Sequence, residues 1–501
     1  MGPKVFNNLA WEDVTQKAGV TSAESPVSPA ADGDGTIFVG IPSFRDGKRC
    51  ADTIRSIFDN AKDPDKVIIG VIEQNSPEDD FCIATYCDFY GAKTINKRKI
   101  RDDVTKIMVV EGREEKCPRF HQIRQVSFFN IAASGPAGAR ALTRKVVGNE
   151  EYCLQIDAHT DFVPQWDALA KADWKKIGNE FAIISTVPAS KADMPDYENW
   201  TGGKNGEVPR QCLVRIADND IPEFPSPTEG KATGLETPLL SHAWSAAFSF
   251  SKCHIEETAP YDPFTQYVFG AEQFSRFARF WTRGYDVYTP TKNIVYHDYT
   301  NNGHDIKEWF KQRRERVRKQ GLLRTKTFLG IEGPEGVSME VAHANLGIYG
   351  LGKRRSLKQL QDFVGIDLTK RQGNKGTSCA VMSWVPYDAS VSPIEHLYDK
   401  ATDLDPQPEF TLRSEFNFYI ESEPEEDKFM VIDADPIQEQ DALPVANTTV
   451  TAGGSPPFMM LLMLWIFGLI VWCMVFVNNG SSSRPGKKRA FKKKAGGVKD
   501  V

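Results

Sequence analysis

The sequence lacks any Cys-x-x-Cys pair and any spacing of histidine and cysteine typical of a zinc site. Its nine cysteines permit disulfides but do not require them, so the redox compartment stays open. The first residues, MGPKVFNNLAWEDVTQ, hold no apolar core of a signal peptide, and Phe6 stands where myristoylation needs Ser or Thr. A net charge of −6 argues against a nucleic-acid-binding protein, because phosphate contacts need clustered lysine and arginine.

One long apolar stretch is present near the C-terminus. Residues 458–477, FMMLLMLWIFGLIVWCMVFV, carry no charge and are long enough to cross ~30 Å of hydrocarbon. The alternative is a buried core helix, but the stretch is apolar all round and follows two prolines. We therefore expect a single membrane-spanning helix, followed by a strongly basic tail at 478–501.

The side of the membrane stays open at this point. A span near the C-terminus without a signal peptide indicates a tail anchor, which leaves the preceding part in the cytosol. The basic tail favours the cytosol for itself and so places the preceding part in the lumen. Two glycosylation sequons, at Asn199 and Asn447, also fit a lumen. We expect a single-pass membrane protein of the endomembrane system (ER or Golgi).

Apolar periodicity predicts an α/β fold. TIFVGIPSF, RCADTIRSIFDNA and KVIIGVIEQN read as strand, helix and strand, which is typical of parallel βαβ units. The pattern also predicts a helix over 122–147, a strand at 152–156, a basic amphipathic helix at 304–326 and a helix beginning near Ser356. CAVMSWV, EFNFYIES and KFMVIDA are expected as further strands within 380–450.

Two polar strand ends suggest a metal site. Ligands bind beyond the carboxyl ends of strands in an open parallel sheet, and Asp157 and His159 follow the strand at 152–156 two residues apart. Residues spaced by two in an extended segment point the same way, so these side chains can hold one cation. His297, in VYHDY, is the candidate third ligand, and the set suits Mn²⁺ or a similar ion. The alternatives are a chance D-x-H triplet and a structural histidine.

Another strand, IFVGIPSFRD, brings Pro42, Ser43, Arg45 and Asp46 to the same edge; the alternative is a plain strand end with a turn. Taken in order, five blocks resemble the eukaryotic and microbial GlcNAc-transferase family over about residues 36–370: IFVGIPSFRD with the helix and strand after it, GPAGARAL, CLQIDAHTDFVPQWD, APYDPFTQYVFGAEQFSRFARFWTRGYDVYTPTKNIVYHDY and YGLGKRRSLKQLQDFVGIDL. The family's usual acidic pair after FFG is reduced to Glu272 in FGAEQ, and its DSH reads DAH.

The resemblance implies a GT-A-type glycosyltransferase, with a nucleotide-sugar-binding α/β fold and a C-terminal extension. The expected organisation is a disordered leader at 1–35, a GT-A catalytic domain at 36–300, a helical part at 301–375, a mixed and acidic stalk at 376–457, the span at 458–477 and the tail. By this analogy Asp157, His159 and His297 hold Mn²⁺ on UDP-GlcNAc. The nucleotide would be bound by Pro42, Ser43, Arg45, Glu73 and Arg140, of which Arg140 also orients Asp157.

Two acidic residues are candidates for the sugar or the acceptor. Glu272, at the start of a helix-like stretch, would bind donor hydroxyls or the acceptor, or else only complements the helix dipole. Asp262, in PYDP, could serve the acceptor or be a turn residue. Trp166 and Trp281 are expected in the core rather than as sugar platforms.

The resemblance implies metal-dependent transfer of GlcNAc from UDP-GlcNAc to a protein hydroxyl, hydroxyproline or Ser/Thr, with retention of configuration. Such transfer passes through an oxocarbenium-like state, in which stabilising the leaving group and positioning the acceptor dominate. Two alternatives stay open: a related transferase that uses another UDP-sugar or a glycan acceptor, and an inactive membrane-anchored scaffold. The expected partners are therefore a UDP-sugar, a protein or peptide acceptor and a membrane, without nucleic acid.

Overall fold

The computed structural model describes the greater part of the chain up to residue 432. The residues described are 2, 4–6, 11–13, 33–76, 78–99, 105–111, 117–195, 206–225, 230–301, 306–331, 346–374, 382–393, 418–421 and 429–432. The expected span at 458–477 and the basic tail lie outside them. Within these ranges, no helix combines the length and the apolar composition needed to cross a membrane.

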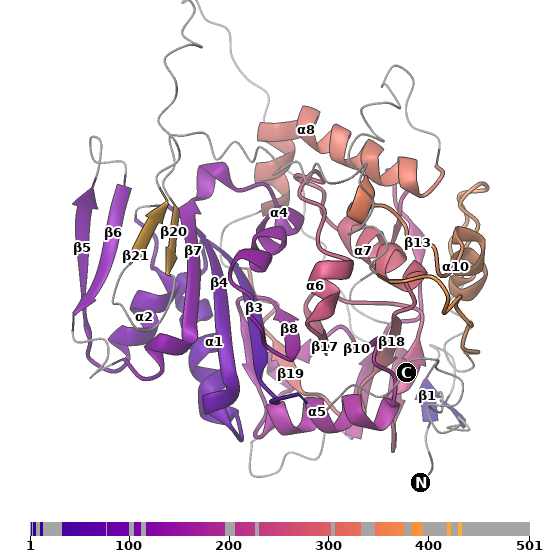
Figure 1. Ribbon diagram of the computed structural model, residues 1–501, viewed down its shortest axis with the longest axis horizontal. Coiled ribbons are helices and arrows are strands. Elements are labelled where there is room, and N and C mark those ends of the chain that lie inside the picture. The colour runs from indigo at the N-terminus through magenta and orange to yellow at the C-terminus, as the bar shows by residue number, and fades with distance from the viewer. Residues whose placement is uncertain are drawn as a thin grey trace, which may run out of the picture. The chain divides into compact units, whose positions relative to one another are not determined.

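A ten-stranded sheet organises the fold (Figure 1). Its strand order is β16 (Leu239–Ser241), β18 (Asp286–Thr289), β10 (Ala182–Ser185), β17 (Phe248–Lys252), β8 (Tyr152–Ile156), β3 (Ile37–Phe44), β4 (Val67–Asn75), β7 (Ile123–Phe129), β20 (Phe418–Glu421) and β21 (Phe429–Ile432). Strands β8, β3, β4 and β7 run parallel, whereas β17 is antiparallel to both of its neighbours. The predicted mixed α/β class with parallel βαβ units is confirmed.

Helices cover both faces of the parallel strands. Ile37, Val39 and Ile41 of β3 share a core with α1 (Gly47–Asn60), α2 (Cys82–Asp88) and α5 (Trp166–Ile177), while Phe38 packs in a separate core with α4 (Pro136–Ala141). Figure 1 shows α1 and α2 beside the indigo and purple strands. Because both faces are buried, β3, β4 and β8 are apolar at most positions rather than alternating. Trp166 and Trp281 are buried, as expected.

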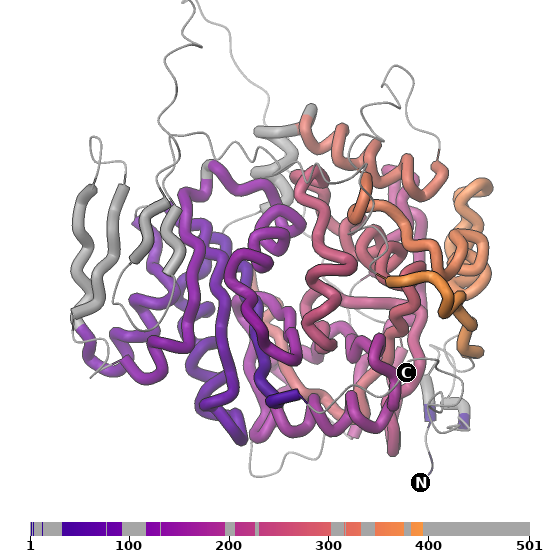
Figure 2. The backbone as a smooth tube through the Cα atoms, in the orientation of Figure 1, coloured from indigo at the N-terminus to yellow at the C-terminus, as the bar shows by residue number. Residues whose placement is uncertain are grey.

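A second core surrounds α7 (Ala271–Thr282), with α6 (His254–Thr258), the end of α8 (Ile306–Phe328) and α10 (Leu357–Val364). Helix α10 begins directly after Ser356, as predicted, and Ser356 and Gln359 form a capping box at its start. Just before it, Arg355 donates to the carbonyls of Trp281 and Tyr285 and pairs with Asp286 at 3.0 Å. Figure 2 shows this orange segment against the part of the chain that holds α7 and β18.

The helix predicted over 122–147 is wrong. The chain there forms the 3₁₀ turn η2 (Phe120–Gln122), strand β7, η3 (Asn130–Ala132), α4 and η4 (Leu142–Lys145). Strand β7 pairs along its whole length with β4, so its β-branched and aromatic residues complete the sheet. The pairing of β7 with β4 therefore outweighs the helical pattern of this segment.

The structure also differs from the expectations for the leader and for CAVMSWV, whereas the two strands expected further on are present. Within the expected disordered leader, β1 (Lys4–Phe6) pairs with β2 (Trp11–Asp13) on one side and with β15 (Gly230–Thr233) on the other, and β15 pairs in turn with β12 (Glu207–Arg210). The strand expected in CAVMSWV is not formed at residues 382–385, because the Val385 carbonyl accepts from Arg355 instead of a neighbouring strand. The strands expected in EFNFYIES and KFMVIDA are confirmed as β20 and β21, and β20 pairs with β7.

The remaining described elements are short or peripheral: β5 (Lys93–Lys99), β6 (Thr105–Glu111), β13 (Arg215–Ile216), β14 (Pro222–Glu223), η1 (Pro64–Lys66), η5 (Lys191–Asp193) and η8 (Gly347–Tyr349). All seven cysteines within the described ranges are disulfide-bonded. The bonds join Cys50 to Cys82, Cys87 to Cys117 and Cys153 to Cys253, and Cys212 is also in a disulfide. Two of these bonds hold α2, one at each of its ends.

Candidate functional site

A small second sheet brings distant residues together at the end of β8. It contains β9 (Thr160–Phe162), β19 (Val295–His297) and β11 (Ala189–Ser190). Strands β9 and β19 are antiparallel, and their register places His297 opposite Thr160. The backbone N–H of Asp298 also donates to the carbonyl of His159 at 2.9 Å. His297 is thereby fixed beside the turn that carries Asp157 and His159.

The three residues predicted as metal ligands converge. One ligand atom from each of Asp157, His159 and His297 lies within 4.8 Å of the other two. The two imidazole rings are edge-on, with centroids 4.5 Å apart, and Nε2 of His297 lies 3.2 Å from Oδ2 of Asp157. One carboxylate and two imidazoles form a donor set that suits Mn²⁺ and similar divalent ions. The chemistry of these residues therefore fits the metal that the sequence predicted.

Asp157 carries a firmly ionised carboxylate. Burial raises its pKa, but the hydrogen bond with His297 and the charge of Arg140 outweigh burial and hold the pKa well below its usual range. Nη2 of Arg140 donates to Oδ1 of Asp157 at 2.7 Å. Each carboxylate oxygen therefore has its own partner, and the group is fixed in orientation.

A cavity of about 430 Å³ opens at this site. Six of the predicted site residues line it: Pro42, Arg140, Asp157, His159, Glu272 and His297. The other four, Ser43, Arg45, Glu73 and Asp262, are not among its lining residues. The cavity lies beyond the carboxyl ends of β3 and β8, which is where an open parallel sheet binds its ligands.

Ser43 and Arg45 turn away from the cavity. The Ser43 side chain is fully buried in β3. Arg45, in the left-handed region at φ 50°, forms a bidentate ion pair with Asp79 at 2.7 and 2.8 Å. Successive residues of a strand alternate in direction, so Pro42 and Phe44 face the cavity while Ser43 cannot.

Glu73 and Asp262 have internal partners. Oε1 of Glu73 accepts from the Cys82 N–H and from Asn75, and Oε2 accepts from Gln125 at 2.5 Å. Burial raises the pKa of Glu73 to about 7 although these bonds oppose the shift. Asp262 is 2% exposed and pairs with Arg324 at 2.7 Å, while it also accepts from the Phe264 N–H, as a turn residue does.

Glu272 is a buried carboxyl group with a free acceptor. It lies in the first turn of α7, is 5% exposed and lines the cavity, and its Oε2 has no hydrogen-bond partner in the described structure. Burial raises the pKa of Glu272 to about 7, although the charge of Arg140 opposes the shift. A buried acceptor without a partner in a cavity wall is available to a ligand hydroxyl.

Sequence reasoning missed several residues of this site. Asp46 was placed at the sheet edge without a role, and its carboxylate contacts Nδ1 of His159 at 2.9 Å. Phe269 and Tyr299 line the cavity and remain 43% and 50% exposed. The Tyr299 ring packs on His297, with centroids 4.2 Å apart. Asp46 could have been found from its position before a helix, whereas the two aromatic residues lie in loops without a pattern.

Comparison with known proteins identifies the class. The model of the family described as Glycosyltransferase (GlcNAc) matches residues 36–370. The chain belongs to this GlcNAc glycosyltransferase family, and it is a glycosyltransferase, as the resemblance predicted. None of the curated proteins compared with it matches its sequence.

Solved structures show weak likeness to the fold. GalNAc-T7 with UDP, GalNAc and Mn²⁺ is 14% identical, with a TM-score of 0.38, over 67% of this chain and 57% of that one. The mannosyltransferase PcManGT from Pyrobaculum calidifontis with GDP-Man and Mn²⁺ is 13% identical, with a TM-score of 0.31, over 65% and 74%. S. aureus TarS 1–349 with UDP-GlcNAc is 11% identical, with a TM-score of 0.35, over 63% and 72%.

The buried ion pair predicts a structural role for Asp262. In Asp262→Asn, Arg324 loses its carboxylate in a buried site, so we expect the free energy of unfolding to fall by about 3 to 5 kcal/mol. Asp367→Asn is the matched control, because it breaks an exposed pair with Lys370 and should lower the free energy of unfolding far less. Urea unfolding measures both. Unchanged stability of Asp262→Asn together with lost sugar transfer would show instead that Asp262 serves the acceptor.

The raised pKa of Glu272 predicts a pH-dependent stability. Between its usual value of 4.5 and about 7 the folded protein binds more protons than the unfolded chain, so stability falls as pH rises through this window and levels off above it. In Glu272→Gln we expect the decrease in the free energy of unfolding across this pH window to be about 3 kcal/mol smaller than in the wild type. Urea unfolding from about pH 5 to about pH 8 tests it. Glu73 titrates in the same window and should keep its own share in the variant, so an unchanged slope would contradict the prediction.

Proposed function

We propose that the protein is a GT-A-type, metal-dependent transferase that moves GlcNAc from UDP-GlcNAc to a protein hydroxyl, either hydroxyproline or Ser/Thr, with retention of configuration. The observation that carries the proposal is the convergence of Asp157, His159 and His297 in one cavity at the carboxyl ends of parallel strands. Membership of the GlcNAc glycosyltransferase family supports the sugar. The protein acceptor rests on the resemblance in sequence.

The metal ligands and Arg140 have different proposed roles at the donor. Asp157, His159 and His297 would hold a divalent cation, which would supply positive charge to a diphosphate leaving group. Arg140 keeps Asp157 ionised and oriented through their 2.7 Å contact. The fixed positions of these groups lower the cost of reorganisation when charge develops.

Glu272 is the proposed contact to a sugar or acceptor hydroxyl. Its Oε2 is buried, lines the cavity and has no partner in the described structure. A hydroxyl that donates to this atom would satisfy it, and the bond would fix the orientation of the donor or the acceptor in the cavity. Pro42, which lines the cavity from β3, is the proposed contact to the nucleoside.

We propose further that the protein is anchored in an endomembrane by residues 458–477 and that its catalytic part lies in the lumen. The anchor rests on the sequence alone, since these residues lie outside the described ranges. The lumenal side is supported by the oxidation of all seven described cysteines, because disulfides form and persist in oxidising compartments and are rare in the cytosol.

The metal proposal predicts the behaviour of Asp157→Ala. We expect the full-length protein to hydrolyse UDP-GlcNAc slowly with Mn²⁺, and the variant to lose about 100-fold or more of this rate because it lacks the charged ligand. Asp161→Ala is the matched control, since Asp161 lies four residues further on, pairs with Lys191 and does not line the cavity. Absence of both turnover and binding with every UDP-sugar would leave the scaffold alternative.

The lumenal proposal predicts blocked thiols. Protein taken from its own cells, denatured without reductant and treated with a maleimide, should carry no label on Cys50, Cys82, Cys87, Cys117, Cys153, Cys212 and Cys253. After reduction all of them should react. Peptide mapping by mass spectrometry reads the labels. Label on Cys50 and Cys82 before reduction would place this part of the chain in a reducing compartment.

A further inference from the structure

Asp46 precedes helix α1 at the position where aspartate normally caps a helix. Its side chain makes no capping hydrogen bond to the first turn. Oδ2 instead lies 2.9 Å from Nδ1 of His159 and 2.7 Å from Nη2 of Arg49. A capping hydrogen bond from this carboxylate would stabilise α1, and Asp46 forgoes that bond while it contacts His159 and Arg49.

This contact fixes which nitrogen of His159 is free. An ionised carboxylate only accepts hydrogen bonds, so Nδ1 of His159 carries the proton and donates to Asp46. Nε2 is then the nitrogen with the lone pair, which is the form of imidazole that binds a metal. Histidine ligands in metalloproteins are commonly held by a carboxylate in this way.

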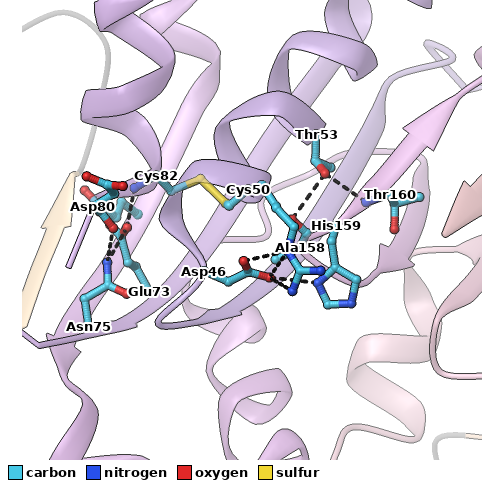
Figure 3. The surroundings of a disulfide bond; sticks show 12 residues. Asp46, Cys50, Thr53, Glu73, Asn75, Asp80, Cys82, Ala158, His159 and Thr160 are labelled. Atoms are coloured by element: carbon cyan, nitrogen blue, oxygen red, sulfur yellow. Dashed lines mark hydrogen bonds and ion pairs between the residues drawn. A yellow bond between two sulfur atoms is a disulfide. The ribbon is translucent and has the colours of Figure 1, made fainter. Parts of the chain in front are cut away.

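Helix α1 also holds the backbone on both sides of His159. Thr53 donates from Oγ1 to the carbonyl of Ala158 at 3.2 Å and accepts from the N–H of Thr160 at 2.9 Å. Figure 3 shows Asp46 and Thr53 reaching this turn from the same helix. The ring and the backbone of His159 are therefore both positioned by α1.

The helix is itself anchored. Cys50, one turn beyond Asp46, is bonded to Cys82 at the start of α2, and both residues are fully buried. In Figure 3 this disulfide lies between the Asp46–His159 contact and the bonds around Glu73. Arg49, in the same turn, reaches the segment after His297 through the Thr300 carbonyl at 2.9 Å and Asp298 at 3.6 Å. One helical turn thus contacts both segments that supply ligands.

We propose that Asp46 is a positioning residue for the metal site, which holds His159 in the tautomer and orientation that turn Nε2 toward Asp157 and His297. The inference rests on the proposed function in that it assumes a divalent cation at these three residues. Asp46 acts through His159, so its loss is expected to weaken metal binding and to leave the remaining chemistry intact.

The test is the affinity of the full-length protein for Mn²⁺ alone, measured by isothermal titration calorimetry. We expect Asp46→Ala to bind Mn²⁺ about 10- to 100-fold more weakly than the wild type, as is usual for residues that hold a metal ligand. Asp46→Asn keeps a neutral acceptor for Nδ1 and should fall between the two. Excess Mn²⁺ should restore UDP-GlcNAc hydrolysis in both variants.

Asp52→Ala is the matched control. Asp52 lies on the same helix and pairs with Arg55 at i,i+3 at 2.7 Å, as Asp46 does with Arg49. Within the described structure it forms no hydrogen bond or ion pair with any of the three ligands. Its Mn²⁺ affinity should equal that of the wild type. An equal loss in Asp52→Ala would overturn the inference, because the effect would then belong to the charge or stability of the helix.

The outcomes separate the inference from the function on which it rests. If the wild type binds Mn²⁺ and Asp46→Ala binds it equally well, Asp46 has no positioning role, and the proposed function stands. If the wild type binds no Mn²⁺, the proposed function fails and the inference fails with it. If thermal melting shows that Asp46→Ala does not fold, Asp46→Asn decides: wild-type affinity overturns the inference, and weakened affinity in a folded protein supports it.

Discussion

The antiparallel pairing of β9 with β19 is the constraint on which the site depends. These two strands of three residues each join parts of the chain separated by more than 130 positions. Their register, together with the bond from the Asp298 N–H to the His159 carbonyl, sets His297 beside Asp157. Shifting the pairing by one residue would send the His297 side chain to the other face of the small sheet. The large sheet fixes the position of Asp157 and His159, which follow the end of β8. The small sheet adds the third residue, His297, to this pair.

The two carboxyl groups Asp157 and Glu272 of the cavity differ in their surroundings and therefore in their pKa values. Asp157 lies between Arg140 and His297 and stays ionised. Glu272 lies in the same cavity without a direct cation and responds by a raised pKa. The two acidic groups therefore differ in protonation because their surroundings differ, which is the arrangement by which one cavity offers both a fixed negative charge and a titratable group.

Much of the fold and the centre of the site could be predicted from the sequence. The apolar runs of β3, β4 and β8 identified parallel strands, and the residues after β8 identified Asp157 and His159, because apolar runs and the polar residues that end them are local properties of the sequence. The directions of Ser43 and Glu73 could not be predicted, since they depend on register and on partners such as Gln125 far along the chain. The helix predicted over 122–147 is wrong for the same reason, because pairing with the distant strand β4 makes residues 123–129 a strand.

The contact between His297 and Asp157 has a consequence for how the site fills. An ionised carboxylate can only accept, so Nε2 of His297 holds a proton when the two residues pair at 3.2 Å. To bind a cation in the proposed site, that nitrogen would have to present its lone pair, so the proton of the neutral ring would move to Nδ1. Nδ1 of His297 is buried and has no hydrogen-bond partner in the described structure. Filling the site therefore exchanges one tautomer of His297 for the other, and the same ring serves either as a donor to Asp157 or as a ligand.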